Sequence, residues 1–337
     1  MSYLYSLVLH KRHIFFIPLF FFAACTFNSP LFSQEPFNPL SPENITVTPL
    51  DEPAQPIPDN EAILHEGYTL FKQENYAEAE NIFSSFLAEH PEHYRTTLML
   101  GNTLYKQNRI EEALAYYQKC ILLEPGEPHG YYNIGLIYLE KDDLQTAVHF
   151  FREAERIQPN NENILYFLGD IFYKTADYPT ALDYFSRVYV LNNHSIRNLF
   201  RIADCFQALS KYEEEAATYL AILKIRRSAY AYHKLGLAYH SLGNSTEEIN
   251  AYLTALTLTP NDNELRFNLA MAYYDNHLNE KSLAELNKIT QPTEDVLYYK
   301  ALIYIEVGDI YSAWRQHALL EPLNREKADE IYTLLTK

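Results

Sequence analysis

The sequence predicts an all-α protein, a solenoid built from repeated pairs of helices. Small residues recur 34 positions apart along most of the chain, and aromatic residues follow them at a fixed distance. Within each period the apolar residues have helical spacing. The composition agrees, because nine glycines in 337 residues with 47% hydrophobic residues are more typical of helices than of a β-sandwich or barrel. A fixed period of this length is typical of a repeat array.

Residues 1–25 are predicted to be a secretory signal. Lys11 and Arg12 precede the apolar stretch "IFFIPLFFFAA", which is too short for a membrane-spanning helix of about 20 residues. The following "FAAC" resembles the bacterial lipobox, so Cys25 is the predicted lipidation site and would anchor the protein to a membrane. The alternative is simple secretion, with cleavage near "LFSQ".

Residues 26–59 are predicted to form an extended, proline-rich tether. Eight prolines fall in this segment and no helical periodicity accompanies them. A lipid on Cys25 would then hold the folded part away from the membrane.

The array is predicted over residues 60–327. Its units lie near 60–93, 94–127, 128–161, 162–195, 196–228, 229–262, 263–293 and 294–327. In the third unit, Gly135 lies on a first helix, "KDD" supplies a polar turn, and Pro159 ends a second helix. Glycine costs about 1 kcal/mol inside a helix. We therefore expect Gly135 and Ala147 to lie where the two helices approach too closely for larger side chains.

The second half departs from this pattern. Glu215, Glu248 and Ser282 occupy positions where the first four units have alanine. Because a buried unpaired carboxylate is costly, we expect a one-residue shift that turns Ala216 and Ile249 inward instead. Residues 328–337 are predicted to belong to a capping helix with a polar outer side.

The unit at residues 128–161 resembles the tetratricopeptide repeat. The matching residues are Tyr131, Ile134, Gly135, Tyr138, Ala147, Phe151, Ala154 and Pro159. The resemblance covers about residues 60–327 and implies a right-handed α-solenoid of about eight helix pairs. It also implies that side chains of the first helices line a concave groove that binds peptides or partner helices.

The resemblance places a set of side chains in that groove. They are Asn102, Tyr105, Tyr132, Asn133, Leu136, Tyr166, Asp170, Tyr173, Arg197, Phe200, Arg201, Asp204, Phe267 and Tyr274. Aromatic residues with polar tips are common on recognition surfaces. The alternative is that part of this stripe packs against the next unit and belongs to the core.

Some members of the family hold a partner's terminal carboxylate with a lysine, asparagine and arginine clamp. Asn102 and Asn133 match its asparagines, but Leu98, Asn163 and Phe167 stand in its basic columns, which disfavours this type of receptor. Arg197 and Arg201, with Lys174 nearby, form a candidate site for an acidic group of a ligand. The alternative is that they pair with Asp170 and Asp204.

We predict no catalytic, metal or cofactor site. No HExxH, CxxC, GxSxG or glycine-rich phosphate motif occurs in the sequence. Cys120 and Cys205 are expected to be buried free thiols. The net charge of −17 with scattered basic residues argues against nucleic-acid binding.

The predicted function is that of a non-catalytic scaffold that binds one or more protein partners. The chain resembles exported bacterial repeat lipoproteins, which implies the periplasmic face of a membrane, or alternatively a soluble secreted or periplasmic protein. The sequence leaves two other functions open, and it does not determine the oligomeric state. One is a self-associating structural protein of the envelope, and the other is a glycan-binding or peptidoglycan-remodelling accessory protein.

Overall fold

The computed structural model describes residues 62–337, which form 17 α-helices and no strand. They are α2 (Ala62–Lys72), α3 (Tyr76–Glu89), α4 (Tyr94–Lys106), α5 (Ile110–Leu123), α6 (Pro128–Glu140), α7 (Leu144–Ile157), α8 (Glu162–Lys174), α9 (Tyr178–Leu191), α10 (Ile196–Ala208), α11 (Tyr212–Ile225), α12 (Ala229–Leu242), α13 (Ser245–Leu258), α14 (Asn263–Asp275), α15 (Asn279–Leu286), α16 (Glu294–Glu306), α17 (Ile310–Leu320) and α18 (Arg325–Leu335). The predicted signal, Cys25 and the tether lie outside the described residues. Within residues 62–337, no helix combines the length and apolar character needed to cross a membrane.

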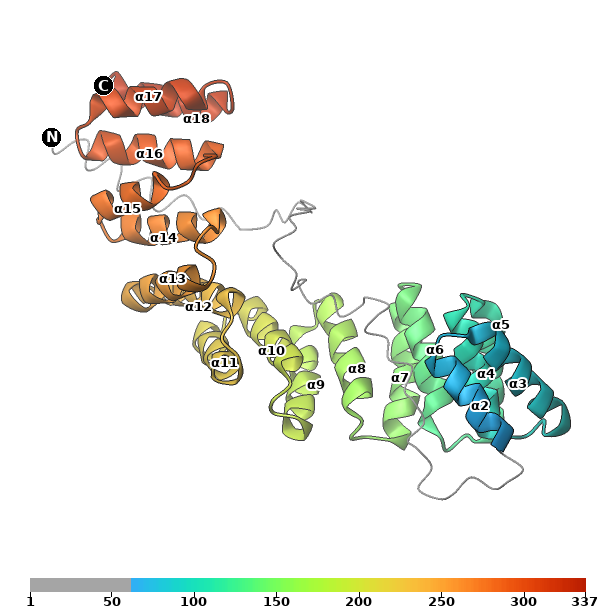
Figure 1. Ribbon diagram of the computed structural model, residues 1–337. Coiled ribbons are helices and arrows are strands. Elements are labelled where there is room, and N and C mark those ends of the chain that lie inside the picture. The colour runs from blue at the N-terminus through green and yellow to red at the C-terminus, as the bar shows by residue number, and fades with distance from the viewer. Residues whose placement is uncertain (1–61) are drawn as a thin grey trace. The chain divides into compact units, whose positions relative to one another are not determined.

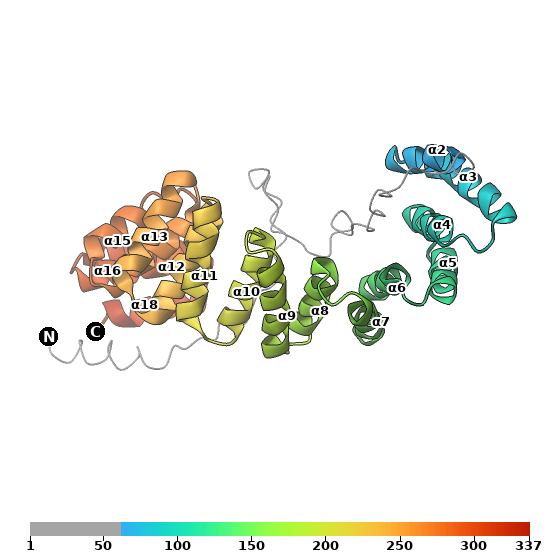
Figure 2. The ribbon, with the colours of Figure 1, turned by 90° about the horizontal axis from the view of Figure 1, so that it is seen from below.

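The helices form a solenoid of eight helix–turn–helix pairs followed by α18, which confirms the predicted fold class. Each helix packs mainly on the helices before and after it in the chain, as Figures 1 and 2 show from two directions. First helices also touch across the pairs, where α8 meets α10 and α16 meets α18. These contacts between first helices bring residues about 30 positions apart into one site.

The glycine positions are explained by an aromatic ring from the second helix of the same pair. A Cβ atom on Gly101 would lie 2.8 Å from the ring of Tyr117, and one on Gly236 would lie 2.3 Å from the ring of Tyr252. At Gly135 the nearest atoms belong to the ring of Phe151, at 3.1 Å. The close approach is therefore real, but the aromatic ring, and not Ala147, lies against the glycine. A ring packed this tightly leaves no room for a side chain.

The turn between the two helices of each pair repeats one backbone device. The residue two positions before the second helix begins has a left-handed conformation in all eight pairs, with φ between 55° and 81°. Only Gly243 and Gly308 are glycines, and the others are Glu74, Asn108, Asp142, Ala176, Ser210 and His277. The next amide then donates to a carbonyl five residues back, as Asp143 N does to Tyr138 O at 2.9 Å. This bond closes the end of the first helix.

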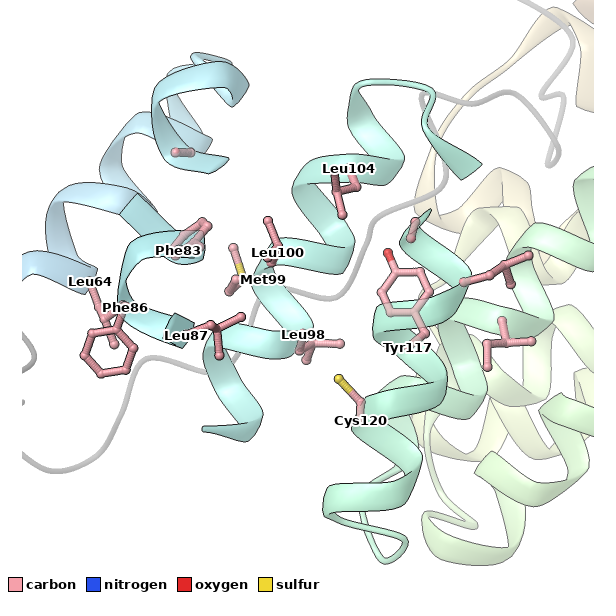
Figure 3. Packing of buried hydrophobic residues seen from close by; sticks show 14 of the residues in the cluster. Leu64, Phe83, Phe86, Leu87, Leu98, Met99, Leu100, Leu104, Tyr117 and Cys120 are labelled. Carbon is pink, nitrogen blue, oxygen red and sulfur yellow. The ribbon is translucent and has the colours of Figure 1, made fainter. Parts of the chain in front are cut away.

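Aromatic and aliphatic side chains fill the space between neighbouring pairs. Figure 3 shows Phe83 and Leu87 of α3, Leu100 of α4 and Tyr117 of α5 gathered between their helices in one cluster of buried residues. Cys120 belongs to the same cluster. Cys120 and Cys205 are free and buried, as predicted, and burial raises the pKa of each thiol to about 12. Such thiols stay protonated and unreactive.

The expected one-residue shift in the fifth and sixth units is wrong. Glu215 N donates to Lys211 O, the bond that Ala113 N makes to Arg109 O, so the helix keeps its register. Glu215 is therefore only 1% exposed, and Ala216 is buried beside it. Ile249 is only partly buried, whereas Glu248 is buried.

Two of the three polar residues at the alanine positions have a partner in the fold. Ser282 Oγ donates to Ala270 O at 2.7 Å, and Glu248 Oε1 lies 3.1 Å from His240 Nδ1. Glu215 Oε1 has no hydrogen-bond partner within the described part of the chain. The fifth unit thus holds a polar group that its own packing does not satisfy.

Candidate partner-binding site

The structure divides the predicted groove residues by burial. Asn102, Tyr132, Asn133, Leu136, Tyr166 and Asp170 are buried. Tyr105, Tyr173, Arg197, Phe200, Arg201, Asp204, Phe267 and Tyr274 are half-buried. The buried side chains all come from the second, third and fourth units, where neighbouring helices already cover them and they belong to the core. From the fifth unit on, the first helices leave the predicted side chains partly exposed.

Asn102 and Asn133 are engaged with each other inside the fold. Asn133 Nδ2 donates to Asn102 Oδ1 at 3.0 Å, and Tyr117 Oη donates to the same oxygen at 2.9 Å. The two asparagines that match the carboxylate clamp thus form a buried amide pair between α4 and α6. Buried amides need such partners, and within the described residues Asn133 Oδ1 still lacks one.

Arg201 connects α8 to α10. Its guanidinium forms an ion pair with Asp170, whose side chain is fully buried, and a second, longer one with Asp204 at 3.7 Å. Its Nε also donates to Tyr166 Oη at 3.4 Å. Arg201 therefore pairs with both aspartates, as one of the two sequence-based alternatives proposed. Its charge is matched within the protein.

Arg197 lies one turn earlier on α10. Its guanidinium carbon is 3.5 Å from the centre of the Tyr166 ring, a cation–π contact. Lys174 on α8 is exposed and near enough to stabilise the charge of Asp170. The predicted neighbourhood of Arg197, Arg201 and Lys174 is thus present in the structure.

Four residues outside the predicted groove complete this site: Glu215 and Tyr219 on α11, and Tyr230 and Lys234 on α12. Asp204 and Lys234 act electrostatically on Glu215, and Asp204 and Tyr230 act on Tyr219, which places these groups together. The only signal in the sequence was the carboxylate at an alanine position. We call the set Asp170, Tyr173, Arg201, Asp204, Glu215, Tyr219, Tyr230 and Lys234 the polar cluster.

Burial dominates the acid–base properties of the polar cluster. It raises the pKa of Glu215 to about 7, an effect that Lys234 opposes and Asp204 increases. It also raises the pKa of Asp170 and of Asp204, and Arg201 opposes both rises. The cluster therefore holds carboxyl groups that their surroundings only partly compensate.

Three buried oxygen atoms of the polar cluster lack a hydrogen-bond partner in the described part of the chain. They are Asp170 Oδ2, Glu215 Oε1 and Tyr219 Oη. Asp204 is 28% exposed and Tyr230 is 50% exposed, so the cluster reaches solvent at this end. A site with unsatisfied acceptors and an open side is suited to receiving a hydrogen-bond donor.

The remaining predicted residues lie outside the cluster. Phe200 borders it, with its ring 5.5 Å from that of Tyr230. Phe267 and Tyr274 lie on α14, where both rings contact Tyr299 of α16. Tyr105 on α4 donates to Glu140 of the next first helix. Among residues 62–337, no group of three or more His, Cys, Asp or Glu side chains has the geometry to hold a metal ion.

Comparisons with known families agree with this architecture. The model described as Tetratricopeptide repeat matches residues 64–121 and 98–162, and a second model of that description matches residues 229–262. The model of anaphase-promoting complex, cyclosome, subunit 3 matches residues 140–222. No curated protein matched the sequence of this chain.

Several solved structures resemble the chain. The C-terminal part of a TPR repeat-containing protein from Cytophaga hutchinsonii is 15% identical, with a TM-score of 0.53, and the match covers 80% of this chain and 98% of that one. YrrB, described as a TPR protein with an unusual peptide-binding site, is 25% identical, with a TM-score of 0.49 and coverage of 54% and 94%. A tetratricopeptide repeat protein from Parabacteroides merdae is 17% identical, with a TM-score of 0.40 and coverage of 82% and 98%. The first of these supports the fold.

Proposed function

Because this chain is a tetratricopeptide-repeat protein, we propose that it is a non-catalytic scaffold that binds a segment of a partner protein along α10, α12 and α14. One observation carries the proposal. The first helices of these pairs leave aromatic and charged side chains half-buried, Phe200, Arg201, Asp204 and Phe267 among them. Such side chains can lose their remaining exposure to a partner without first leaving the core.

Burial of aromatic rings would supply the affinity of this interaction. Phe200 and Phe267 keep part of their surface open while their rings contact Tyr230 and Tyr299. Rings held by their neighbours lose little side-chain entropy when a partner covers them. The charged groups between them would fix the position of the bound segment.

The test selects short linear peptides from a displayed library on the full chain. The affinity of the selected peptides is then measured for wild type and for Phe200→Ala with Phe267→Ala. We expect the double substitution to weaken binding at least tenfold, because it removes two aromatic contacts worth about 1 kcal/mol or more each. Circular dichroism checks that the helical content is retained.

Tyr189→Ala provides a matched control for an aromatic ring on a second helix. Tyr189 is exposed on α9, which is not one of the three helices of the proposed face, so this variant should bind the peptides as wild type does. Equal binding by wild type and the double variant would reject the face, and a library that yields no binder would reject the function.

We further propose that the scaffold acts in the bacterial cell envelope, anchored by a lipid on Cys25. The basic residues, short apolar stretch and "FAAC" sequence support export, and the eight prolines after them suit a spacer between membrane and repeats.

A clickable fatty acid tests the anchor. Cells that express the wild-type chain should yield a labelled protein in the membrane fraction, and Cys25→Ala should abolish the label and release the protein. Cys120→Ala controls for loss of a thiol, because that residue is buried in the repeats. Labelling of both Cys25→Ala and wild type, or of neither, would contradict lipidation at Cys25.

A further inference from the structure

We propose that the polar cluster receives one lysine or arginine side chain from the bound segment, so that the site selects a basic partner. This inference rests on the proposed function and adds the chemistry of the partner. It differs from the acidic ligand that the sequence suggested for Arg197 and Arg201. The difference follows from which hydrogen-bonding groups the fold leaves unused.

The cationic side of the site is already occupied. Arg201 directs its guanidinium at Asp170, Asp204 and Tyr166. The guanidinium of Arg197 lies against the Tyr166 ring. An acidic ligand would have to compete with Asp170 and Asp204 for Arg201, and it would approach a carboxylate at Asp204. Like charges at such distances repel one another.

The acceptor side of the site is not satisfied. Asp170 Oδ2 and Glu215 Oε1 are buried acceptors without a partner in the described residues, and Tyr219 Oη is a buried hydroxyl in the same state. A buried acceptor left unpaired costs about 1–3 kcal/mol. An ammonium or guanidinium group brings several donors and a positive charge, so it can satisfy acceptors that a neutral donor would satisfy less well.

Lys234 shows that a cation is favourable near these groups. Its charge stabilises the ionised forms of both Asp204 and Glu215. However, Lys234 forms no ion pair with a carboxylate of the described residues, and its Nζ lies 5.6 Å from the centre of the Tyr230 ring. The unpaired acceptors of the cluster are therefore left for another donor.

The route into the site is open beside Asp204. Asp204 and Tyr230 both keep exposed surface, and Phe200 lies next to Tyr230. A partner segment that covers Phe200 would thus place a neighbouring side chain at the entrance of the polar cluster. The net charge of −17 would also speed the approach of a basic segment.

The peptide selection described above tests this inference with a second set of variants. We expect the peptides selected on the full chain to share one lysine or arginine. Replacement of that residue by glutamine should weaken binding to wild type at least tenfold. On a variant that combines Asp204→Asn with Glu215→Gln, the same replacement should change binding less than twofold. Asp183→Asn, an exposed carboxylate on α9, is the matched control and should behave as wild type.

Peptide affinity measured over a pH series tests the role of Glu215 directly, because a purely structural role would not make that affinity depend on the ionisation of Glu215. The charged groups that act on Glu215 are Asp204 on α10 and Lys234 on α12, and Glu215 in turn acts on Tyr219 of its own helix. Burial raises the pKa of Tyr173 and of Tyr230 to about 12, so both stay neutral. The pKa of Glu215 is about 7, and a bound cation favours its ionised form. Affinity for the basic peptide should therefore rise from pH 6 to pH 8, and Glu215→Gln should flatten this rise.

The outcomes separate the two proposals. Peptides that bind through Phe200 and Phe267 but share no cation, or carry an acidic residue there, would overturn the basic site and leave the scaffold function standing. That result would mean that water alone satisfies the buried acceptors. An equal cost of the glutamine replacement on wild type and on the double variant would place the cation elsewhere. A library without binders would overturn both proposals.

Discussion

Replacing Arg201 with methionine is expected to destabilise the protein by about 3 kcal/mol at neutral pH. Arg201 is the only residue that forms an ion pair with Asp170 within the described part of the chain, and the Asp170 side chain is fully buried. Removing one partner of a buried ion pair typically costs 3–5 kcal/mol because the other charge stays buried without compensation. The pKa of Asp170 is already raised by burial, so protonation would limit the loss. Urea unfolding followed by circular dichroism measures the effect.

Two further variants show whether the buried charge is the cause. Arg201→Met combined with Asp170→Asn should recover most of the stability, because no charge then remains buried. Arg156→Met removes an exposed arginine that pairs with Glu153 on α7, and it should cost less than about 1 kcal/mol. If Arg201→Met and Arg156→Met lower the free energy of unfolding by the same small amount, the ion pair between α8 and α10 does not stabilise the protein as predicted.

Replacing Glu215 with glutamine is expected to stabilise the protein at pH 8 and to change it little at pH 4. Burial raises the pKa of this carboxyl group from 4.5 to about 7. The folded state therefore binds the proton more tightly than the unfolded state, and the free energy of unfolding falls as the pH rises from about 4.5 through 7. The raised pKa of Glu215 corresponds to a loss of roughly 3 kcal/mol in the free energy of unfolding, at about 1.4 kcal/mol for each tenfold change in proton affinity. Glutamine does not ionise, so the variant should not lose this stability.

The measurement is the free energy of unfolding of both proteins at several pH values between 4 and 8. Glu214→Gln is the control, because it removes the same charge from an exposed position in the first turn of α11. The difference between wild type and Glu215→Gln should grow with pH, whereas the difference between wild type and Glu214→Gln should stay nearly constant. Parallel pH profiles for wild type and Glu215→Gln would show that Glu215 ionises freely in the folded protein.

The stability cost of Glu215 is consistent with a role in binding. Alanine occupies the same helix position in the first four units and is fully buried there. The fifth unit instead carries a carboxyl group with an unsatisfied oxygen beside Asp204 and Lys234. Groups that serve binding often reduce the stability of the free protein, because they are arranged for a partner. The two stability experiments therefore test the polar cluster in the free protein, and the peptide selection tests the same cluster in binding.

The sequence by itself determined the class of fold and the number of helix pairs. A column of small residues, a column of aromatics and regular polar turns are local signals that repeat every 34 residues or close to it. Each unit packs chiefly on its neighbours, so a one-dimensional pattern was enough to predict the stack. The buried thiols followed from the same columns. The left-handed turn residues were not predicted, because six of the eight are not glycine and give no signal of that conformation.

Only the tertiary structure decided which of the first-helix residues remain available. Tyr132 and Tyr166 have the same spacing as Phe200, yet they are buried and Phe200 is not. The burial of a side chain depends on what the neighbouring pairs place against it, which lies about 30 residues away in the sequence. For the same reason the sequence identified Arg201 but left open whether Asp170 and Asp204 compensate its charge. It predicted that Glu215 points outward, because burying a carboxylate is generally costly. The helix register is fixed by many packed residues at once, and it kept Glu215 inside because shifting them all would have cost more than one unsatisfied oxygen.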